Sequence, residues 1–239
     1  MLPSKIIPSL VSFMVGLISS GLVIGTVYKL YGYGVKKLRK GRRGDEGSED
    51  EDEIFTEVLM FPDKHIACKN NFLLESGCVR SDCSLSHYKT SLSEIYRRLC
   101  AAKKYICVCV FHITYKDLVD ILIAMNKKGV CIQVITDDEK TDSESQVDRL
   151  RAHNIPVRTD HSSSFMHHKF TVIDRKIVIH GSFNWTFSAI NGNLENVLIT
   201  NDSDIAQNFQ REFDLLWTKF DMTANNQKHT NGCIKHIKL

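Results

Sequence analysis

The stretch Met166-His-His-Lys-Phe-Thr-Val-Ile-Asp174 carries the most informative pattern in this sequence. Its apolar residues predict a buried strand near 166–173, and a second strand is predicted near 176–180. Side chains alternate between the two faces of a strand, so His167 and Lys169 are expected on one face. A lysine beside a histidine suits a phosphate group, because the ammonium holds the anion and the imidazole can act on phosphorus.

The pattern continues downstream with Gly181-Ser-Phe-Asn184. Ser182 and Asn184 are two positions apart and are therefore expected on the same face of an extended chain. Both are expected to donate hydrogen bonds to the same bound anion. Negative charge that develops on a phosphodiester in the transition state needs such fixed donors. HxKxxxxD alone is expected by chance in roughly a few per cent of chains of this length, and the added GSxN lowers that frequency about a thousandfold or more. The combination predicts a phosphodiesterase site rather than a buried hairpin with incidental polar residues.

The two patterns together resemble the HKD signature of the phospholipase D superfamily. Glu195 lies where members of that family have an acidic residue that orients the catalytic histidine. The resemblance implies an α/β fold with a mixed β-sheet flanked by helices on both faces. It assigns the catalytic roles to His167, Lys169 and Asp174, with phosphate-binding or supporting roles for Ser182, Asn184 and Glu195.

The resemblance also implies a mechanism in which two HKD motifs meet on a twofold axis. One histidine attacks phosphorus and forms a phosphohistidine, the other protonates the leaving oxygen, and water then releases the phosphoryl group. An imidazole with a pKa of ~6.5 can fill either role near neutral pH, but one ring cannot fill both at once. The chain contains a single HxKxxxxD, so a C2 homodimer is predicted. No catalytic metal is expected for this chemistry.

The rest of the chain from Ile54 onward alternates between helical and strand periodicity. Ser91 and Glu94 are spaced as a capping box and predict the start of a helix. Apolar runs of strand length occur at 106–111, 130–135 and 196–200. The final helix carries an apolar stripe at helical spacing, made of Phe209, Phe213, Leu216, Trp217 and Phe220. This alternation predicts an α/β layer fold independently of the resemblance.

Residues 6–28 form a stretch without a single charge, which fits the ~20 apolar residues of a transmembrane helix. A cleaved signal peptide is the alternative, but only Lys5 precedes the stretch and the basic residues follow it. That basic flank favours a cytosolic position for the rest of the chain. Blocks of basic and then acidic residues across 29–53 indicate a solvated linker.

Cysteine and histidine are spaced as C-x9-C-x4-C-x3-H in a segment that precedes the predicted core. Three thiolates and one imidazole, with no open position, suit a structural zinc ion. Free cysteines and disulfides are the alternatives, and disulfides are disfavoured in the cytosol. The set resembles a CCCH zinc finger, a type often found on RNA-binding proteins. The predicted ligands are Cys68, Cys78, Cys83 and His87.

The formal net charge of +3 is small, so bulk composition does not mark a nucleic-acid binder. The predicted organisation is therefore that of one globular domain with appendages. Its parts are a short N-terminal tail at 1–5, an anchor at 6–28, a linker at 29–53, a catalytic domain at 54–225 with the zinc-binding insert at 68–87, and a C-terminal tail at 226–239.

An anchor, a CCCH set and a single HKD motif together resemble a subgroup of small superfamily members on the mitochondrial outer membrane. That resemblance implies a single-pass protein whose catalytic domain faces the cytosol. It implies two substrates, cardiolipin cleaved to phosphatidic acid or single-stranded RNA cleaved to leave a 5′-phosphate in piRNA maturation. RNA needs a basic groove along its backbone, whereas lipid needs an apolar rim beside the bilayer. The alternative from another class is a non-catalytic membrane-tethered dimeric adaptor, which an eroded His167 or Lys169 would have favoured.

Overall fold

The computed structural model describes three stretches of the chain, residues 53–137, 145–160 and 164–221. The chain divides into two compact units, residues 1–52 and 53–239. The anchor predicted at 6–28 and the tail predicted at 226–239 lie outside the described residues. Within the described stretches, every helix is too short or too polar to cross a bilayer.

A seven-stranded sheet organises the second unit, with strand order β1-β7-β6-β5-β2-β3-β4. β2, β3 and β4 run parallel to one another, and the other neighbouring pairs are antiparallel. The predicted mixed sheet is therefore confirmed. The strands are β1 (Thr56–Phe61), β2 (Tyr105–Val110), β3 (Cys131–Asp137), β4 (Val157–Asp160), β5 (Lys169–Ile173), β6 (Ile177–Gly181) and β7 (Glu195–Thr200).

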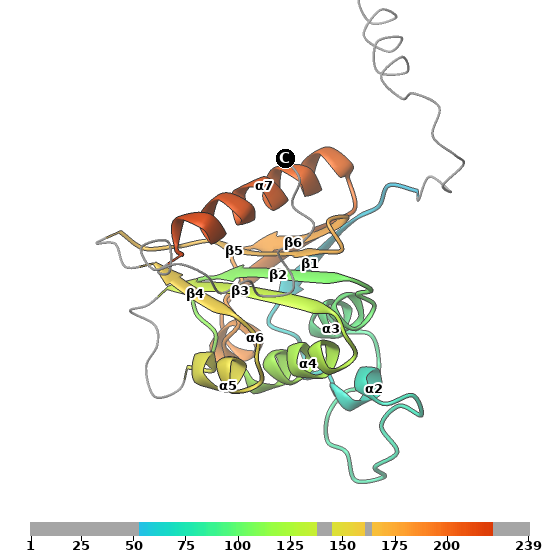
Figure 1. The fold of residues 1–239 in the computed structure, drawn as a ribbon. Helices are drawn as coiled ribbons and strands as arrows, with labels where there is room; N and C mark the ends of the chain where they lie inside the picture. Colours follow the sequence, from blue (N-terminus) through green and yellow to red (C-terminus); the bar gives the residue numbers. More distant parts are fainter. Residues whose placement is uncertain (1–52, 138–144, 161–163, 222–239) are drawn as a thin grey trace, which may run out of the picture. The chain divides into compact units, whose positions relative to one another are not determined.

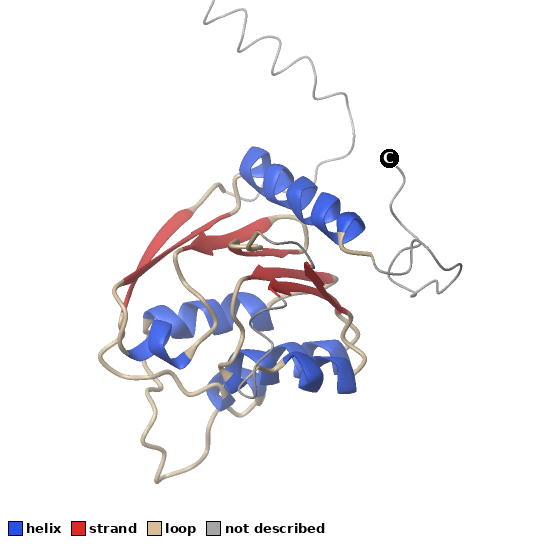
Figure 2. Cartoon of the chain, turned by 90° about the vertical axis from the view of Figure 1, so that its left-hand side faces the viewer, coloured by secondary structure: helices blue, strands red, loops and turns tan. Residues whose placement is uncertain are grey.

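Helices cover both faces of this sheet, as the sequence predicts. Figure 1 shows α7 on one face, with α3, α4, α5 and α6 on the other, and Figure 2 shows the same layers from the side. The helices are α2 (Asn70–Leu73), α3 (Ser91–Cys100), α4 (Lys116–Lys127), α5 (Val147–Ala152), α6 (Phe187–Asn191) and α7 (Ser203–Lys219).

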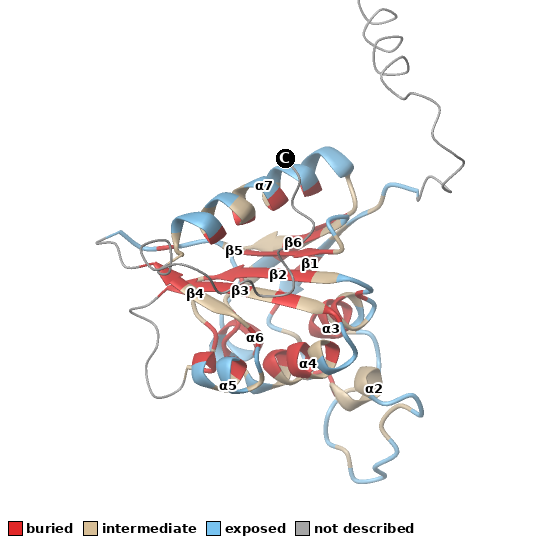
Figure 3. Cartoon of the chain, in the orientation of Figure 1, coloured by how far each residue is buried: buried red, intermediate tan, exposed pale blue. Residues whose placement is uncertain are grey.

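Each face of the sheet has its own hydrophobic core. Val108 of β2 is buried in the cluster shared with α3 and α4, whereas its neighbour Cys109 is buried in the cluster under α7. Phe213 and Trp217 of α7 lie in that second cluster, which confirms the predicted apolar stripe. The buried residues of the strands and of the inward helix surfaces line up on the two sides of the sheet (Figure 3).

The start of α3 differs from the prediction by one residue. Thr90 is the N-cap, because its extended backbone lets its Oγ1 accept from the N–H of Ser93 at 3.1 Å. Ser93 Oγ in turn accepts from the N–H of Thr90 at 2.7 Å, which completes a capping box. Glu94 is not part of that box. Its buried carboxylate accepts from the guanidinium of Arg97 at 3.0 Å.

The central strand also begins later than predicted, at Lys169 rather than Met166. The N–H of Met166 donates to Asp137 Oδ2 at 2.9 Å instead of to a neighbouring strand. The carbonyl of His168 still accepts from the N–H of Phe111 at 2.9 Å. Residues 167 and 168 therefore lie at the end of the sheet, just before the first residue of β5.

The turn between β5 and β6 is held by Asp174, which has a φ of 51°. Its carboxylate accepts three backbone hydrogen bonds from the segment that leads into β2. The donors are the N–H groups of Lys103 at 2.7 Å, Lys104 at 2.7 Å and Tyr105 at 2.8 Å. Hydrogen bonds to a charged acceptor are stronger than neutral ones, so this side chain ties the ends of two central strands together.

We expect Asp174→Ala to lower the free energy of unfolding by about 2 kcal/mol or more, because three N–H groups lose a charged acceptor. Urea denaturation of the purified variant measures the loss. Asp148→Ala is the matched control, because the Asp148 side chain is 98% exposed and pairs with Arg151 at 3.5 Å. We expect a change within about 0.5 kcal/mol for the control. Equal stability of the two variants would contradict the assigned role of Asp174.

Candidate active site

His167 and Lys169 meet on one aromatic ring. The ring centroids of His167 and Phe111 are 4.7 Å apart, and Lys169 Nζ lies 5.0 Å from the centroid of the same Phe111 ring. Lys169 Nζ also donates to the carbonyl oxygen of His167 at 2.9 Å. The cation and the imidazole predicted to share a face therefore lie side by side at the end of the sheet.

The neighbouring side chains point to the other face, toward α7. The His168 ring lies 5.4 Å from Phe170, and its Nε2 lies 3.4 Å from a carboxylate oxygen of Glu212 in α7. Phe170 packs on Phe209 of the same helix at 4.9 Å. The predicted alternation is seen in these contacts, since His168 and Phe170 contact α7 whereas His167 and Lys169 contact Phe111.

The two key side chains differ in their exposure. Lys169 is half-buried, and burial lowers the pKa of its ammonium, although the negative charge of Glu195 opposes that shift. The side chain of His167 is exposed. Within the described stretches, its ring receives no hydrogen bond from another side chain. The imidazole is accessible to a substrate or to a second protein chain.

Gly181 allows β6 and β7 to approach closely at this end of the sheet. A Cβ added to Gly181 would lie 2.0 Å from the carbonyl oxygen of Asn196, so any other residue would push β7 away. The next residue, Ser182, donates from its Oγ to Glu195 Oε2 and accepts from the N–H of Asn196 at 3.1 Å. Asn193 donates to Glu195 Oε1 at 2.9 Å. Ser182 and Glu195 are thus brought together.

The contacts of Asn184 and Glu195 do not test the roles that were predicted for them. Asn184 follows β6 and is half-buried, and its buried Oδ1 accepts no hydrogen bond from the described part of the chain. No hydrogen bond joins Glu195 to His167 among the residues that the structure describes. The expected role of Glu195 in orienting the histidine therefore stays a prediction, as does the donor role of Asn184.

Asp174 is not brought to this end of the sheet. The whole of β5, Lys169–Ile173, separates it from the other two residues, and five strand residues span about 16 Å. Its carboxylate is occupied by three backbone N–H groups at the opposite end. Asp174 therefore supports the sheet in this structure, and its catalytic role stays a prediction.

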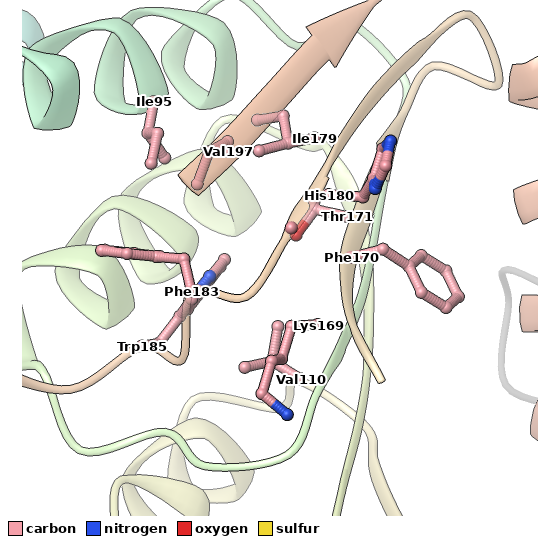
Figure 4. Close-up of a pocket in the computed structure, with 11 residues that line it drawn as sticks. Ile95, Val110, Lys169, Phe170, Thr171, Ile179, His180, Phe183, Trp185 and Val197 are labelled. Atoms are coloured by element: carbon pink, nitrogen blue, oxygen red, sulfur yellow. The ribbon is translucent and has the colours of Figure 1, made fainter. Parts of the chain in front are cut away.

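A small hollow lies under Lys169 on the α3 side of the sheet. Figure 4 shows Val110, Phe183 and Trp185 around it, with Phe170 pointing to the opposite side of the strand. Its volume of about 10 Å³ holds roughly one water molecule. The hollow is therefore too small for a phosphodiester substrate.

The predicted zinc ligands also come together. One Sγ or imidazole nitrogen from each of the four lies within 4.8 Å of all the others, and no other such group is found in the described stretches. Cys83 Sγ is 3.8 Å from Cys68 Sγ, and two sulfurs bound to one tetrahedral zinc at ~2.3 Å are about 3.8 Å apart. A bridge between Ala67 and Ser86 closes the base of this loop. The donor set fits a structural zinc ion, and its members are Cys68, Cys78, Cys83 and His87.

Phe111 was not among the residues predicted for the site. The sequence signal for it was its place as the last residue of the apolar run 106–111. In open α/β sheets, site residues gather at the carboxyl ends of the parallel strands. Phe111 sits at that end, just beyond Val110 of β2.

Comparisons with known proteins identify the family to which this chain is similar. The family described as "Cardiolipin synthase, PLD-like domain" matches residues 95–217. The chain is similar to a protein of Chlamydomonas reinhardtii named mitochondrial cardiolipin hydrolase, at 39% identity over 69% of this chain and 74% of that one. Proteins of the same name from Mus musculus and Homo sapiens are 39% and 35% identical, over 72% and 70% of this chain and 81% and 69% of theirs.

Solved structures show the same fold. The chain resembles Nuc, a phospholipase D family member from Salmonella typhimurium, with a TM-score of 0.55 and 21% identity over 70% of this chain and 95% of that one. It resembles NucT from Helicobacter pylori with a TM-score of 0.53 and 18% identity, over 70% and 97% of the two chains. With its HxKxxxxD and GSxN patterns, its mixed sheet and these matches, the chain belongs to the PLD-like family of the phospholipase D superfamily.

Proposed function

We propose that the chain hydrolyses cardiolipin to phosphatidic acid at the mitochondrial outer membrane. The observation that carries this proposal is the exposed His167 beside Lys169 on the Phe111 ring, at an end of the sheet rimmed by apolar side chains. The relatives named mitochondrial cardiolipin hydrolase support both the substrate and the organelle. The charge-free stretch at 6–28 supports a single-pass anchor with the catalytic domain in the cytosol.

In the proposed reaction, the Lys169 ammonium holds the non-bridging phosphate oxygens. An imidazole nitrogen of His167 attacks phosphorus, so that a P–N bond forms while the P–O bond to the leaving group breaks. His167 of a second copy protonates the leaving oxygen and becomes neutral. That ring then takes a proton from water, the resulting hydroxide attacks phosphorus, and the P–N bond breaks to free the monoester.

The position of the imidazole supports a homodimer. One chain supplies one HxKxxxxD and one exposed His167. A C2 axis that passes beside this residue brings the two copies of His167 to one phosphate from opposite sides. The resemblance supports the same arrangement, since its mechanism requires two motifs.

Apolar side chains around this end of the sheet favour a lipid substrate. Phe165, which is 60% exposed, packs on the Phe111 ring at 5.7 Å. Leu194 is 90% exposed and directly precedes Glu195. Met60 is also exposed and is paired with Asn196 across β1 and β7. Exposed apolar side chains beside a polar site suit the interface of a bilayer.

Single-stranded RNA is the second candidate, as in piRNA maturation with 5′-phosphate products. The observation that favours it is the convergence of Cys68, Cys78, Cys83 and His87 at metal-binding distances. The resemblance of this set to CCCH fingers links it to RNA-binding proteins. RNA cleavage would use the same two-histidine chemistry, because both substrates are phosphodiesters.

We expect His167→Ala in the full-length protein to lower phosphodiester hydrolysis by about a thousandfold or more, because the nucleophile is lost. Cardiolipin vesicles and a single-stranded RNA are assayed in parallel. His65→Ala is the matched control, because this histidine is exposed and lies outside the site, and it should stay within about threefold of the unmodified chain. RNA cleavage without cardiolipin hydrolysis would replace the first candidate by the second. Unchanged activity of His167→Ala would reject both and favour a non-catalytic adaptor.

We propose that the Cys/His set holds a structural zinc ion, and we expect one zinc per chain by elemental analysis. Cys83→Ser should lower the zinc content and the melting temperature, because metal binding contributes to folding free energy. Cys100→Ser is the control, since Cys100 is a free, half-buried cysteine outside the set. Brief chelation should leave turnover unchanged before any unfolding. Immediate loss of turnover would contradict a purely structural role.

A further inference from the structure

A second, larger cavity opens beside the histidine. Its volume is about 420 Å³, and it lies between the segment that precedes β5 and the end of α7. This volume falls in the range of ~300–1,000 Å³ that small-molecule sites occupy. The residues that line it are Asp160, Ser164, Phe165, Met166, His167, His168, Leu216, Lys219 and Phe220.

The wall of this cavity is mostly apolar. Met166 is buried, and it belongs to the hydrophobic cluster under α7. Leu216 and Phe220 are half-buried and pack against the same cluster. Phe165 is exposed and also lines the cavity. A ligand in this cavity would therefore cover apolar surface that water now contacts, which favours a hydrocarbon group.

Polar residues also line the cavity, and they are Asp160, Ser164, His167, His168 and Lys219. His167 borders both the cavity and the Phe111 ring. Lys219 is exposed at the end of α7. A ligand with a phosphate and a hydrocarbon chain fits this lining, with its phosphate at His167 and its chain against Leu216.

We propose that this cavity binds an acyl chain of a lipid whose phosphodiester is cleaved at His167. The inference rests on the proposed lipid hydrolysis and deepens it, because it assigns the residues that select for chain length. A single-stranded nucleic acid is disfavoured, since its backbone needs a groove lined by a series of cations. Beyond the two histidines, Lys219 is the one cation among the described lining residues.

The test compares two tryptophan substitutions on adjacent residues of α7 in the full-length protein. Leu216→Trp fills the cavity while it keeps the wall apolar. Leu215→Trp is the matched control, because Leu215 is 67% exposed and does not line the cavity. The substrates are long-chain cardiolipin, short-chain cardiolipin, a single-stranded RNA and the small chromogenic diester bis(p-nitrophenyl) phosphate, which has no acyl chain.

We expect Leu216→Trp to lower kcat/KM for long-chain cardiolipin by about tenfold or more, with bis(p-nitrophenyl) phosphate hydrolysis unchanged. The preference for long over short chains should disappear in this variant and persist in Leu215→Trp. Unchanged hydrolysis of the small diester shows that the fold and both histidines are intact. Should that hydrolysis fall in Leu216→Trp, Leu216→Gln takes its place, because an amide of similar size makes the wall polar without filling it.

Three results would overturn the inference. Equal loss of long-chain and short-chain cardiolipin hydrolysis would remove the chain-length role, as would no loss at all. A selective loss of single-stranded RNA cleavage would assign the cavity to a nucleobase. Failure of the unmodified protein to hydrolyse any cardiolipin, with the small diester still cleaved, would instead reject the proposed substrate itself.

Discussion

The backbone of β5 sends alternate side chains to opposite faces of the sheet, and the site depends on this alternation. His167 and Lys169 reach the Phe111 ring on one face, while Phe170 joins the core under α7 on the other. A shift of one residue would exchange the two sets and bury the reactive pair. The core on each face therefore fixes the site, because moving the cation and imidazole would also expose Phe170.

The opposite end of β5 contributes to the same constraint. Asp174 accepts hydrogen bonds from the three N–H groups that precede and begin β2, and Phe111 follows the last residue of β2. Holding β2 and β5 in register at one end sets the position of the aromatic ring at the other. The motif thus joins two reactive residues to a residue that supports the sheet beneath them. Its third member, Asp174, binds backbone N–H groups at the opposite end of β5.

The sequence predicted the sheet, the helices on both faces, and the face shared by His167 and Lys169, because apolar periodicity reports burial directly. It did not predict β1, whose exposed Val58 and Met60 weaken the strand pattern. The sequence did not predict the hydrogen bonds of Asp174 to the backbone near β2, since spacing along a chain does not show which end of a strand a side chain serves, and its catalytic role stays a prediction. Phe111 was missed because contacts between neighbouring strands depend on register, which only the fold supplies.

The central claim is that two copies of His167 are needed for one reaction, and heterodimers test it most directly. Unmodified and His167→Ala chains carrying different affinity tags are co-expressed, and the mixed dimer is isolated by two purification steps. If both imidazoles act on one phosphate, the mixed dimer should hydrolyse the diester at less than about a hundredth of the unmodified rate, close to the His167→Ala homodimer. Retention of half the unmodified rate would show that each chain works alone, and would contradict the account.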